Sequence, residues 1–412
     1  MQFRELGLCA PILRAAAEAG YTQPSPIQEK AIGPVLAGRD VLGCAQTGTG
    51  KTAAFAMPIL HRLAQGGARG YIRALVLTPT RELALQIDES FAAYGRHLPL
   101  RHLVVFGGVG QGPQVAALQK GVDILTATPG RLNDLAGQGY IDLSRLEVFV
   151  LDEADRMLDM GFWPTMKKVV AATPSSRQTL LFSATLDRKV MQSVSSILKD
   201  PAFVEVSHKG ETADTIDQFM IPVGPMKKPA LLRLVLQQRG SKRVIVFADT
   251  KTRAEICTGQ LKRAGFRADS IHSDKTQVQR KRALEGFSKG AIDVLVATDV
   301  LARGIDVSNI EYVVNYDLPE SPEDYVHRIG RTGRAGETGY AISFVSPEAK
   351  AQLLDIEKLL GERIPTLDID GYDATEAEKA LASQFVPKAT VGSAAFSRSL
   401  RRNGASGFGR RR

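Results

Sequence analysis

The sequence predicts an α/β protein with two successive parallel sheets, and three observations lead to that prediction. Short apolar, β-favouring runs alternate with helical patterns, as in parallel sheets that helices cover on both faces. The alternation pauses around residues 207–226 and then restarts. Nearly every run ends in a small polar cluster, and open parallel sheets bind ligands beyond the carboxyl ends of their strands. A length of 412 residues leaves room for two such domains.

The predicted first domain spans residues 1–207. It begins with a helix from Ala10 to Ala19, which Gly20 ends, and a turn with two prolines follows. Its strands are expected at the apolar runs 40–44, 74–77, 103–106, 124–125, 148–151 and 180–182.

A polar linker is predicted at 208–217 and a second domain at 218–365. The strands of the second domain are expected at 244–247, 269–271, 294–297, 312–314 and 341–345. Residues 366–412 are expected to form a polar and then basic tail that is largely disordered, with 388–412 disordered throughout.

Charge and cysteine usage narrow the class of protein. Of the net charge of +9, the segment from Lys379 to Arg412 carries +8 with no acid, which leaves +1 (9 − 8) for the rest. No apolar run is long enough to predict a membrane span, and the first residues do not predict a secretory signal. Cys9, Cys44 and Cys257 show no ligand spacing and indicate a reducing compartment. We therefore expect a cytoplasmic protein.

The most informative motif is Ala45–Thr52, which lies between a predicted strand and a predicted helix. Gly48 and Gly50 let successive backbone N–H groups point into one concavity, and the helix directs its positive end there. Lys51 would contact the β/γ-phosphates of a nucleotide, and the Thr52 hydroxyl could bind Mg²⁺. The alternative is a glycine-rich turn with a surface lysine, and the usual first Gly is Ala here.

Asp152–Asp155, with the sequence Asp-Glu-Ala-Asp, follows a buried strand, which is where a Mg²⁺-organising carboxylate belongs. Asp152 would hold the metal, and Glu153 would orient or deprotonate the attacking water. An acidic start of a helix is the alternative.

Arginines recur at every third position in the segment 327–334, and glycines separate them. Such an array can reach a γ-phosphate as arginine fingers, whereas a single arginine would suggest a solvated turn. Two other segments are less specific. Asp306 could cap a helix or bind a ribose, and Ser183–Thr185 is common in turns and caps.

Taken together, these motifs resemble the DEAD-box ATP-dependent RNA helicases. The matching segments, in chain order, are Phe3 with Gly20–Gln28 (the Q motif), Ala45–Thr52, 79–84, 107–108, 128–131, Asp152–Asp155, Ser183–Thr185, 277–280, 297–306 and 327–334. This family carries Ala first in its phosphate loop, which explains Ala45. The motif order and the short basic tail look most like the bacterial RhlE-type subgroup. One departure is Ser273, where the family commonly has Gly between His272 and Asp274.

The resemblance implies two tandem RecA-like domains, ATP and Mg²⁺ as cofactors, and RNA as the partner. ATP contacts are implied for Phe3, Tyr21, Gln28, Gln46, Thr47, Gly48, Thr49, Gly50, Lys51, Thr52, Gly304 and Asp306. Catalytic roles are implied for Lys51, Asp152, Glu153, His327, Arg331 and Arg334, and metal contacts for Thr52 and Asp152. Coupling to a closed state is implied for Asp155, Ser183 and Thr185. Contacts with the RNA backbone are implied for Thr80, Arg81, Gly108, Thr128, Arg131, Arg280 and Thr298.

The implied function is RNA-stimulated ATP hydrolysis, coupled to closure of a cleft that unwinds short RNA duplexes or remodels RNA–protein complexes. Gln28 would read the adenine edge, so ATP should be preferred over GTP. Backbone contacts carry no sequence information, and the 2′-OH distinguishes RNA from DNA. Two alternatives stay open: a DNA helicase or translocase on the same scaffold, and an ATP-dependent RNA clamp that seldom unwinds. Protein partners in RNA processing or ribosome assembly would fit the family. The tail would add salt-sensitive RNA affinity, or serve solubility alone.

Overall fold

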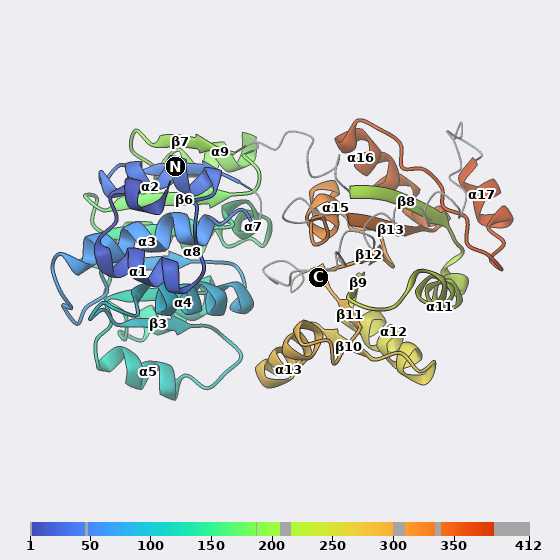
Figure 1. The fold of residues 1–412 in the computed structure, drawn as a ribbon, viewed down its shortest axis with the longest axis horizontal. Coiled ribbons are helices and arrows are strands. Elements are labelled where there is room, and N and C mark those ends of the chain that lie inside the picture. The colour runs from blue at the N-terminus through green and yellow to red at the C-terminus, as the bar shows by residue number, and fades with distance from the viewer. Residues whose placement is uncertain are drawn as a thin grey trace, which may run out of the picture. The chain divides into compact units, whose positions relative to one another are not determined.

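The computed structural model describes residues 2–45, 48–186, 188–206, 216–299, 310–333 and 339–382. The chain divides into two compact units between Ser207 and His208 (Figure 1). Several predicted features lie outside the described residues, namely Gln46, Thr47, Gly304, Asp306, Arg334, most of the linker 208–217 and the basic tail 388–412.

The first unit is built on a seven-stranded parallel sheet with the strand order β3-β4-β2-β5-β6-β1-β7. In chain order the strands are β1 (Val41–Cys44), β2 (Ala74–Leu77), β3 (His102–Val105), β4 (Ile124–Ala127), β5 (Val148–Asp152), β6 (Gln178–Ser183) and β7 (Ala202–Glu205). The predicted strands of this domain are confirmed to within a few residues at their ends. The edge strand β7 was not predicted; its apolar run, Ala202–Val204, is short, and Phe203 within it is 58% exposed.

Helices cover both faces of this sheet (Figure 1). They are η1 (Phe3–Leu6), α1 (Ala10–Glu18), α2 (Pro26–Leu36), α3 (Lys51–Ala64), α4 (Arg81–Gly95), α5 (Gly112–Gln119), α6 (Pro129–Gly137), α7 (Ala154–Asp159), α8 (Trp163–Ala171) and α9 (Arg188–Val194). Alternate residues of a strand enter opposite cores. In β5, Val148 and Val150 pack with α1–α4, and Phe149 and Leu151 pack on the other face. A strand buried on both faces therefore has an unbroken apolar sequence.

The second unit has a six-stranded parallel sheet with the strand order β10-β11-β9-β12-β13-β8. Its strands are β8 (Ile216–Pro222), β9 (Val244–Phe247), β10 (Ala268–Ile271), β11 (Val294–Ala297), β12 (Tyr312–Asn315) and β13 (Gly339–Val345). Its helices are η2 (Pro225–Lys227), α11 (Lys228–Arg239), α12 (Lys251–Arg263), α13 (Gln277–Ser288), α15 (Pro322–Ile329), η3 (Pro347–Ala349), α16 (Lys350–Leu360) and α17 (Thr375–Ala382). The two parallel sheets confirm the predicted fold class.

Two predicted boundaries are wrong in this unit. The end of the linker 208–217 was placed two residues too far along the chain, because β8 begins at Ile216 and pairs with β13 in parallel. Residues 366–382 belong to the fold rather than to a disordered tail: Leu367 is buried, and α17 closes the segment. Polar residues between these buried positions hide the pattern in the sequence.

Hydropathy gives one further result. Within the ranges that the structure describes, no helix is both long and apolar enough to cross a lipid bilayer.

Candidate active site

The sheet order of the first unit brings three motifs together. The strands β5, β6 and β1 are neighbours, and their carboxyl ends lead into Asp152–Asp155, Ser183–Thr185 and the phosphate loop. The structure therefore supplies the common edge that the polar strand ends predicted.

The phosphate loop holds a buried cation that no described residue hydrogen-bonds. Gly48 and Gly50 have φ values of +90° and +91°, where a side chain is strained. Lys51, the first residue of α3, is only 7% exposed. Its Nζ donates no hydrogen bond to any described residue. A buried ammonium in this state is costly, so the site fits an anion such as the β/γ-phosphates of ATP.

Two carboxylates lie at the end of β5. Asp152 is buried, and burial raises its pKa to about 6, while the charge of Lys51 opposes that shift. Glu153 adopts a left-handed conformation with φ 55° and ψ 53°, which costs a non-glycine residue about 1–3 kcal/mol. Its Oε2 lies 3.5 Å from Nη1 of Arg156. Strain of this kind is typical of functional sites.

The described residues include no cluster of three or more His, Cys, Asp or Glu side chains that could hold a metal. Mg²⁺ does not require one, because it commonly takes one or two protein ligands with phosphate and water. The Thr52 hydroxyl and the Asp152 carboxylate fit that donor set. Thr52 follows Lys51 in the sequence, and the charge of Lys51 acts on Asp152.

Asp155 joins two of the motifs. Its Oδ2 accepts hydrogen bonds from the backbone N of Ala184 at 3.1 Å, the backbone N of Thr185 at 3.0 Å and Oγ1 of Thr185 at 3.1 Å. In return, the Asp155 backbone N donates to Oγ of Ser183 at 3.2 Å. The three residues with predicted coupling roles therefore form one hydrogen-bonded group.

Gln28 connects the Q motif to the phosphate loop. It is buried in α2, where Oε1 accepts from the backbone N of Ser25 at 2.9 Å and Nε2 donates to the Gly50 carbonyl at 3.1 Å. Nearby, Tyr21 makes an edge contact with Phe3, with ring centroids 6.1 Å apart. A movement of the phosphate loop would therefore change the hydrogen bond between Gln28 and Gly50. The contact of Gln28 with adenine stays a prediction.

The other half of the same sheet edge holds the residues with predicted RNA contacts. Thr80, Gly108 and Thr128 follow β2, β3 and β4, which are neighbours in the sheet. Thr80 and Thr128 are both buried N-caps, of α4 and α6, and Oγ1 of Thr80 accepts from a backbone N at 3.3 Å. Phosphate-binding and RNA-binding candidates thus occupy separate halves of one edge.

Two arginines lie within this group. Arg81 lies against Gly108, and a Cβ added to that glycine would come 2.1 Å from Nη1 of Arg81. Arg131 donates from Nη2 to the Val109 carbonyl at 3.0 Å. The glycine therefore gives Arg81 its space, and Arg131 supports the loop after β3.

In the second unit, the predicted residues are more buried than surface contacts would suggest. Arg280 in α13 is 2% exposed, Thr298 after β11 is 8% exposed, and Arg331 after α15 is 3% exposed. Arg331 donates from Nε to the His327 carbonyl at 3.2 Å.

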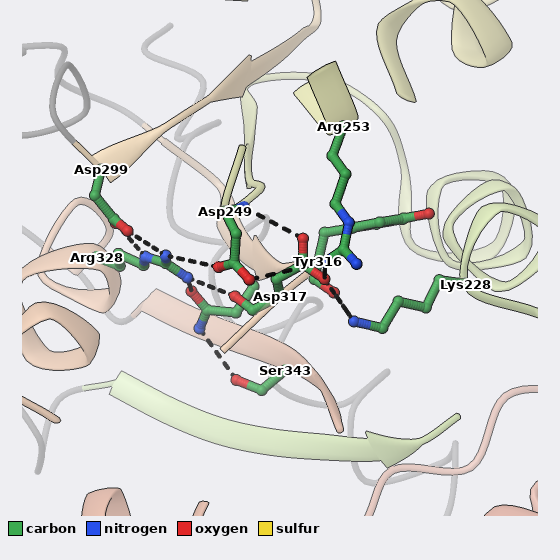
Figure 2. A network of polar contacts seen from close by, with 9 residues as sticks. Lys228, Asp249, Arg253, Asp299, Tyr316, Asp317, Arg328 and Ser343 are labelled. Atoms are coloured by element: carbon green, nitrogen blue, oxygen red, sulfur yellow. Dashed lines mark hydrogen bonds and ion pairs between the residues drawn. The ribbon is translucent and has the colours of Figure 1, made fainter. Parts of the chain in front are cut away.

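Arg328 is the residue whose importance the sequence did not reveal. It is fully buried, and its Nε and Nη2 donate to the two carboxylate oxygens of Asp299, both at 2.5 Å (Figure 2). Its Nη1 donates to the Asp317 carbonyl at 2.6 Å. The equal spacing of the arginines in 327–334 gave no sign that this one is structural.

The departure at Ser273 falls in a turn after β10. Its neighbour His272 is buried and lies with Nε2 2.6 Å from Oε1 of Glu255. Asp274 pairs with Lys251, with Oδ2 2.8 Å from Nζ. Both neighbours are therefore held by partners outside the turn.

Comparisons with known proteins agree with this geometry. Residues 25–194 match the DEAD/DEAH box helicase family, and residues 226–336 match the helicase conserved C-terminal domain. The DEAD-box ATP-dependent RNA helicase CshA of Bacillus cereus (strain ATCC 10987 / NRS 248) is 40% identical over 384 residues, covering 92% of this chain and 73% of the relative. The ATP-dependent RNA helicase CshA of Listeria monocytogenes is 41% identical over 374 residues, covering 90% and 71%.

Solved structures are similar across both units. Dbp5 of S. cerevisiae bound to RNA and ADP BeF3 is 33% identical, with a TM-score of 0.80, and the match covers 92% of this chain and 99% of that one. Mss116p bound to ssRNA and AMP-PNP is 28% identical, with a TM-score of 0.80 and a coverage of 92% and 81%. The curated relatives named here are CshA proteins, so they support the family and not specifically the RhlE-type subgroup. The chain belongs to the DEAD-box ATP-dependent RNA helicases.

Proposed function

We propose that the chain is an RNA-dependent ATPase that hydrolyses ATP to ADP and phosphate and thereby opens short RNA duplexes or remodels RNA–protein complexes. The observation that carries the proposal is the buried Nζ of Lys51, which lacks a hydrogen-bond partner among the described residues. It lies on the same sheet edge as the group around Arg81. Neighbours of this fold have been solved with RNA and nucleotide analogues.

Each residue of the phosphate site has a proposed task. Lys51 and the backbone N–H groups of its loop hold the β/γ-phosphates and neutralise their charge. Thr52 and Asp152 would hold Mg²⁺, which supplies further neutralisation of the phosphates when bound. Glu153 orients the attacking water and accepts its proton. The left-handed backbone of Glu153 supports this task, because strain at a functional residue fixes its direction.

The second unit contributes the arginines. Arg331 and Arg334 are proposed as fingers that stabilise charge in the transition state, with His327 beside them and Asp306 on the ribose. Replacing Arg331 with Ala should lower the ATPase rate far more than the affinity for ATP, because a finger acts on developing charge. An equal loss of ATP affinity would contradict the finger role.

ATP and RNA binding are proposed to be coupled. Each would engage both units and favour a closed state, so each should tighten the binding of the other by the same factor. The group formed by Asp155, Ser183 and Thr185 supports this coupling, since it joins the carboxylate motif to β6. RNA would be held through its backbone and so without sequence preference.

The deciding experiment is steady-state ATP hydrolysis with and without single-stranded RNA, with DNA as competitor. Lys51→Ala is the inactive variant, and Lys167→Ala is the matched control because Lys167 is exposed in α8. We expect stimulation by RNA alone, lost in Lys51→Ala and kept in Lys167→Ala. Stimulation by DNA would favour a DNA translocase. Persistent RNA binding with slow phosphate release and little unwinding would favour an RNA clamp.

Four further features remain proposals. A cytoplasmic location is proposed from the cysteine usage. Protein partners in RNA processing or ribosome assembly, and membership of the RhlE-type subgroup, are proposed from the motif resemblance. The basic segment 388–412 would add RNA affinity that falls with salt. Deleting it should weaken RNA binding at low salt, whereas unchanged binding would leave solubility as its role.

A further inference from the structure

The two units repeat one plan, strand for strand. When the strands of each unit are counted along the chain, β8–β13 take the same places in their sheet that β1–β6 take in theirs. Local details repeat as well. Thr80 caps α4 after β2, and Thr250 caps α12 after β9, each through its hydroxyl. The counterpart of the strand that leads into the phosphate loop is therefore β8.

A lysine begins the first α-helix that follows each of these two strands. Lys51 is the first residue of α3, and Lys228 is the first residue of α11. Carboxylates follow the counterpart strands in the same way: Asp152 ends β5, and Asp317 lies just after β12. The second unit thus has a lysine and an aspartate where the first has those of the phosphate site.

Their surroundings differ in one decisive respect. Nζ of Lys228 donates to Oδ1 of Asp317 at 2.7 Å and to the Tyr316 carbonyl at 2.7 Å (Figure 2). The two side chains are 8% and 4% exposed, so the ion pair is buried. Nζ of Lys51 makes no hydrogen bond to a described residue, although its charge acts on Asp152. In the second unit, the charge of Lys228 is thus balanced by Asp317, a side chain of the same unit.

The carboxylate of Asp317 is surrounded by donors that could also bind a phosphate. Besides Lys228, its Oδ1 accepts from Nη1 of Arg253 at 2.9 Å, and its Oδ2 accepts from the backbone N of Asp249 at 3.2 Å. Arg253 belongs to the first turn of α12, where the helix end adds positive potential. A cavity of ≈ 310 Å³ lies directly beside the group and is lined by Lys228, Arg253, Asp317, Tyr316 and Ser346, among others.

Asp317 also contacts Arg328 in α15. Its backbone carbonyl accepts from Nη1 of Arg328 at 2.6 Å, and that arginine clamps Asp299 with two hydrogen bonds. Arg328 lies in α15, three residues before Arg331. A shift of Asp317 would therefore move Arg328 and with it α15, which ends just before Arg331.

We infer that the carboxylate of Asp317 replaces a nucleotide phosphate in a degenerate copy of the phosphate site. The second unit therefore binds no nucleotide of its own, and the Lys228–Asp317 pair acts as a positioning element for Arg328 and α15. The replacement itself stands on the contacts of Asp317. Only its effect on catalysis rests on the proposed role of Arg331.

Removing the built-in anion should create a site for an external one. In Asp317→Ala, Lys228 and Arg253 lose a shared carboxylate next to an existing cavity, so inorganic phosphate should bind there and stabilise the fold. Stabilisation by a ligand grows with its concentration as a saturable binding term. At a phosphate concentration ten times its Kd, the ratio of folded to unfolded protein should rise about elevenfold.

The test is thermal unfolding of the full chain in phosphate and in chloride at equal ionic strength. All variants carry Lys51→Ala as well, so that phosphate cannot act at the first site. Asp293→Ala is the matched control, because Asp293 also pairs with an arginine, Arg267, which is 57% exposed. We expect a saturable, phosphate-specific gain in Asp317→Ala, and none in the control or in the chain with Asp317 intact.

A second variant, Asp317→Asn, tests the inference in case Asp317→Ala folds poorly. Asp317→Asn keeps the shape of the side chain and removes its charge, so phosphate should stabilise it too. Adding Lys228→Met to Asp317→Asn should abolish that response. A phosphate effect equal to that of chloride in both Asp317 variants would overturn the inference of a replaced phosphate.

Catalysis supplies the separate readout for positioning. With the natural Lys51 restored, Asp317→Asn should lower kcat of the RNA-stimulated ATPase by roughly tenfold to a hundredfold, as misplaced groups do, with KM for ATP nearly unchanged. An unchanged kcat would overturn the positioning role while leaving the phosphate result intact. A normal kcat in Arg331→Ala would instead contradict the proposed function, and the phosphate result would again stand.

Discussion

Replacing Asp155 with Asn tests whether the hydrogen-bonded group behind the Asp-Glu-Ala-Asp motif holds the first unit together. One oxygen, Oδ2, accepts three hydrogen bonds from Ala184 and Thr185, and the other, Oδ1, accepts from the backbone N of Arg156 at 2.9 Å. An asparagine amide has one accepting oxygen and one donating nitrogen. Whichever way it points, N–H groups on one side lose their acceptor.

The size of the effect follows from these contacts. A hydrogen bond to a charged group contributes about 1.5–3 kcal/mol net, and a buried donor left without an acceptor costs about 1–3 kcal/mol. The three bonds to Oδ2 share one oxygen and do not add. In its better orientation the amide keeps them as weaker neutral bonds and loses the bond from Arg156. We therefore expect Asp155→Asn to lower the free energy of unfolding of the first unit by about 2–3 kcal/mol.

Fluorescence of the single tryptophan, Trp163 in α8, measures this unit selectively during urea unfolding. Asp134→Asn is the control, because that carboxylate is 54% exposed and lies 3.8 Å from Nε of Arg131. An exposed pair of this kind contributes at most about 1 kcal/mol. A loss in Asp155→Asn no larger than in the control would refute the argument that this group stabilises the unit.

Three other substitutions follow from single observations. Gly108→Ala should displace Arg81 and strain a backbone with φ +75°, which should weaken binding of labelled RNA several-fold and leave ATP affinity unchanged. Thr185→Ala removes one of the hydrogen bonds to Asp155 and should cost about 1 kcal/mol by urea unfolding, less than Asp155→Asn. Burial, helped by the charge of a neighbouring carboxylate, raises the pKa of Asp249 from 3.8 to about 6. A carboxyl with a raised pKa in the folded state stabilises the fold below its unfolded pKa, and this stabilisation is lost as the pH rises through the folded pKa. Between pH 4 and pH 7, the free energy of unfolding of Asp249→Asn should therefore increase relative to that of the natural protein. The gain should be about 1 kcal/mol after allowance for the half-exposed side chain, and the difference in melting temperature at each pH measures it.

Much of the fold was predictable because parallel strands buried on both faces have unbroken apolar runs. Four-residue strands such as β2 and β9 lie at the positions predicted from their sequences. Two edge strands, β7 and β8, were not predicted in this way, whereas the edge strands β3 and β10 were. In β8, the polar residues Asp217 and Gln218 interrupt the apolar run, and β7 has only four residues and ends in Glu205. An edge strand has only one neighbour in the sheet, so its sequence is less constrained.

The site was predictable where chemistry dictates the residue type, and less so where burial decides the role. A phosphate loop requires glycines at left-handed positions followed by a lysine, which the sequence displays openly. By contrast, Arg328 and Arg331 belong to one regular motif, yet the fully buried Arg328 clamps the half-buried carboxylate of Asp299 at two points. The distinction depends on Asp299 and Asp317, which come from β11 and β12, and only the folded sheet brings those ends to α15.

The duplication explains why one chain can have two similar sheets and a single nucleotide site. Both units direct a helix-initiating lysine at the edge of a parallel sheet, and a buried ammonium there needs a counter-charge. In the second unit Asp317 provides it permanently, with Arg253 sharing the carboxylate. In the first unit no described residue hydrogen-bonds to Nζ of Lys51, and the backbone of Glu153, which follows Asp152, is strained. The first unit thus forgoes stability that a nucleotide can restore, whereas the second gains its stability from its own side chains and is free to hold arginines in place.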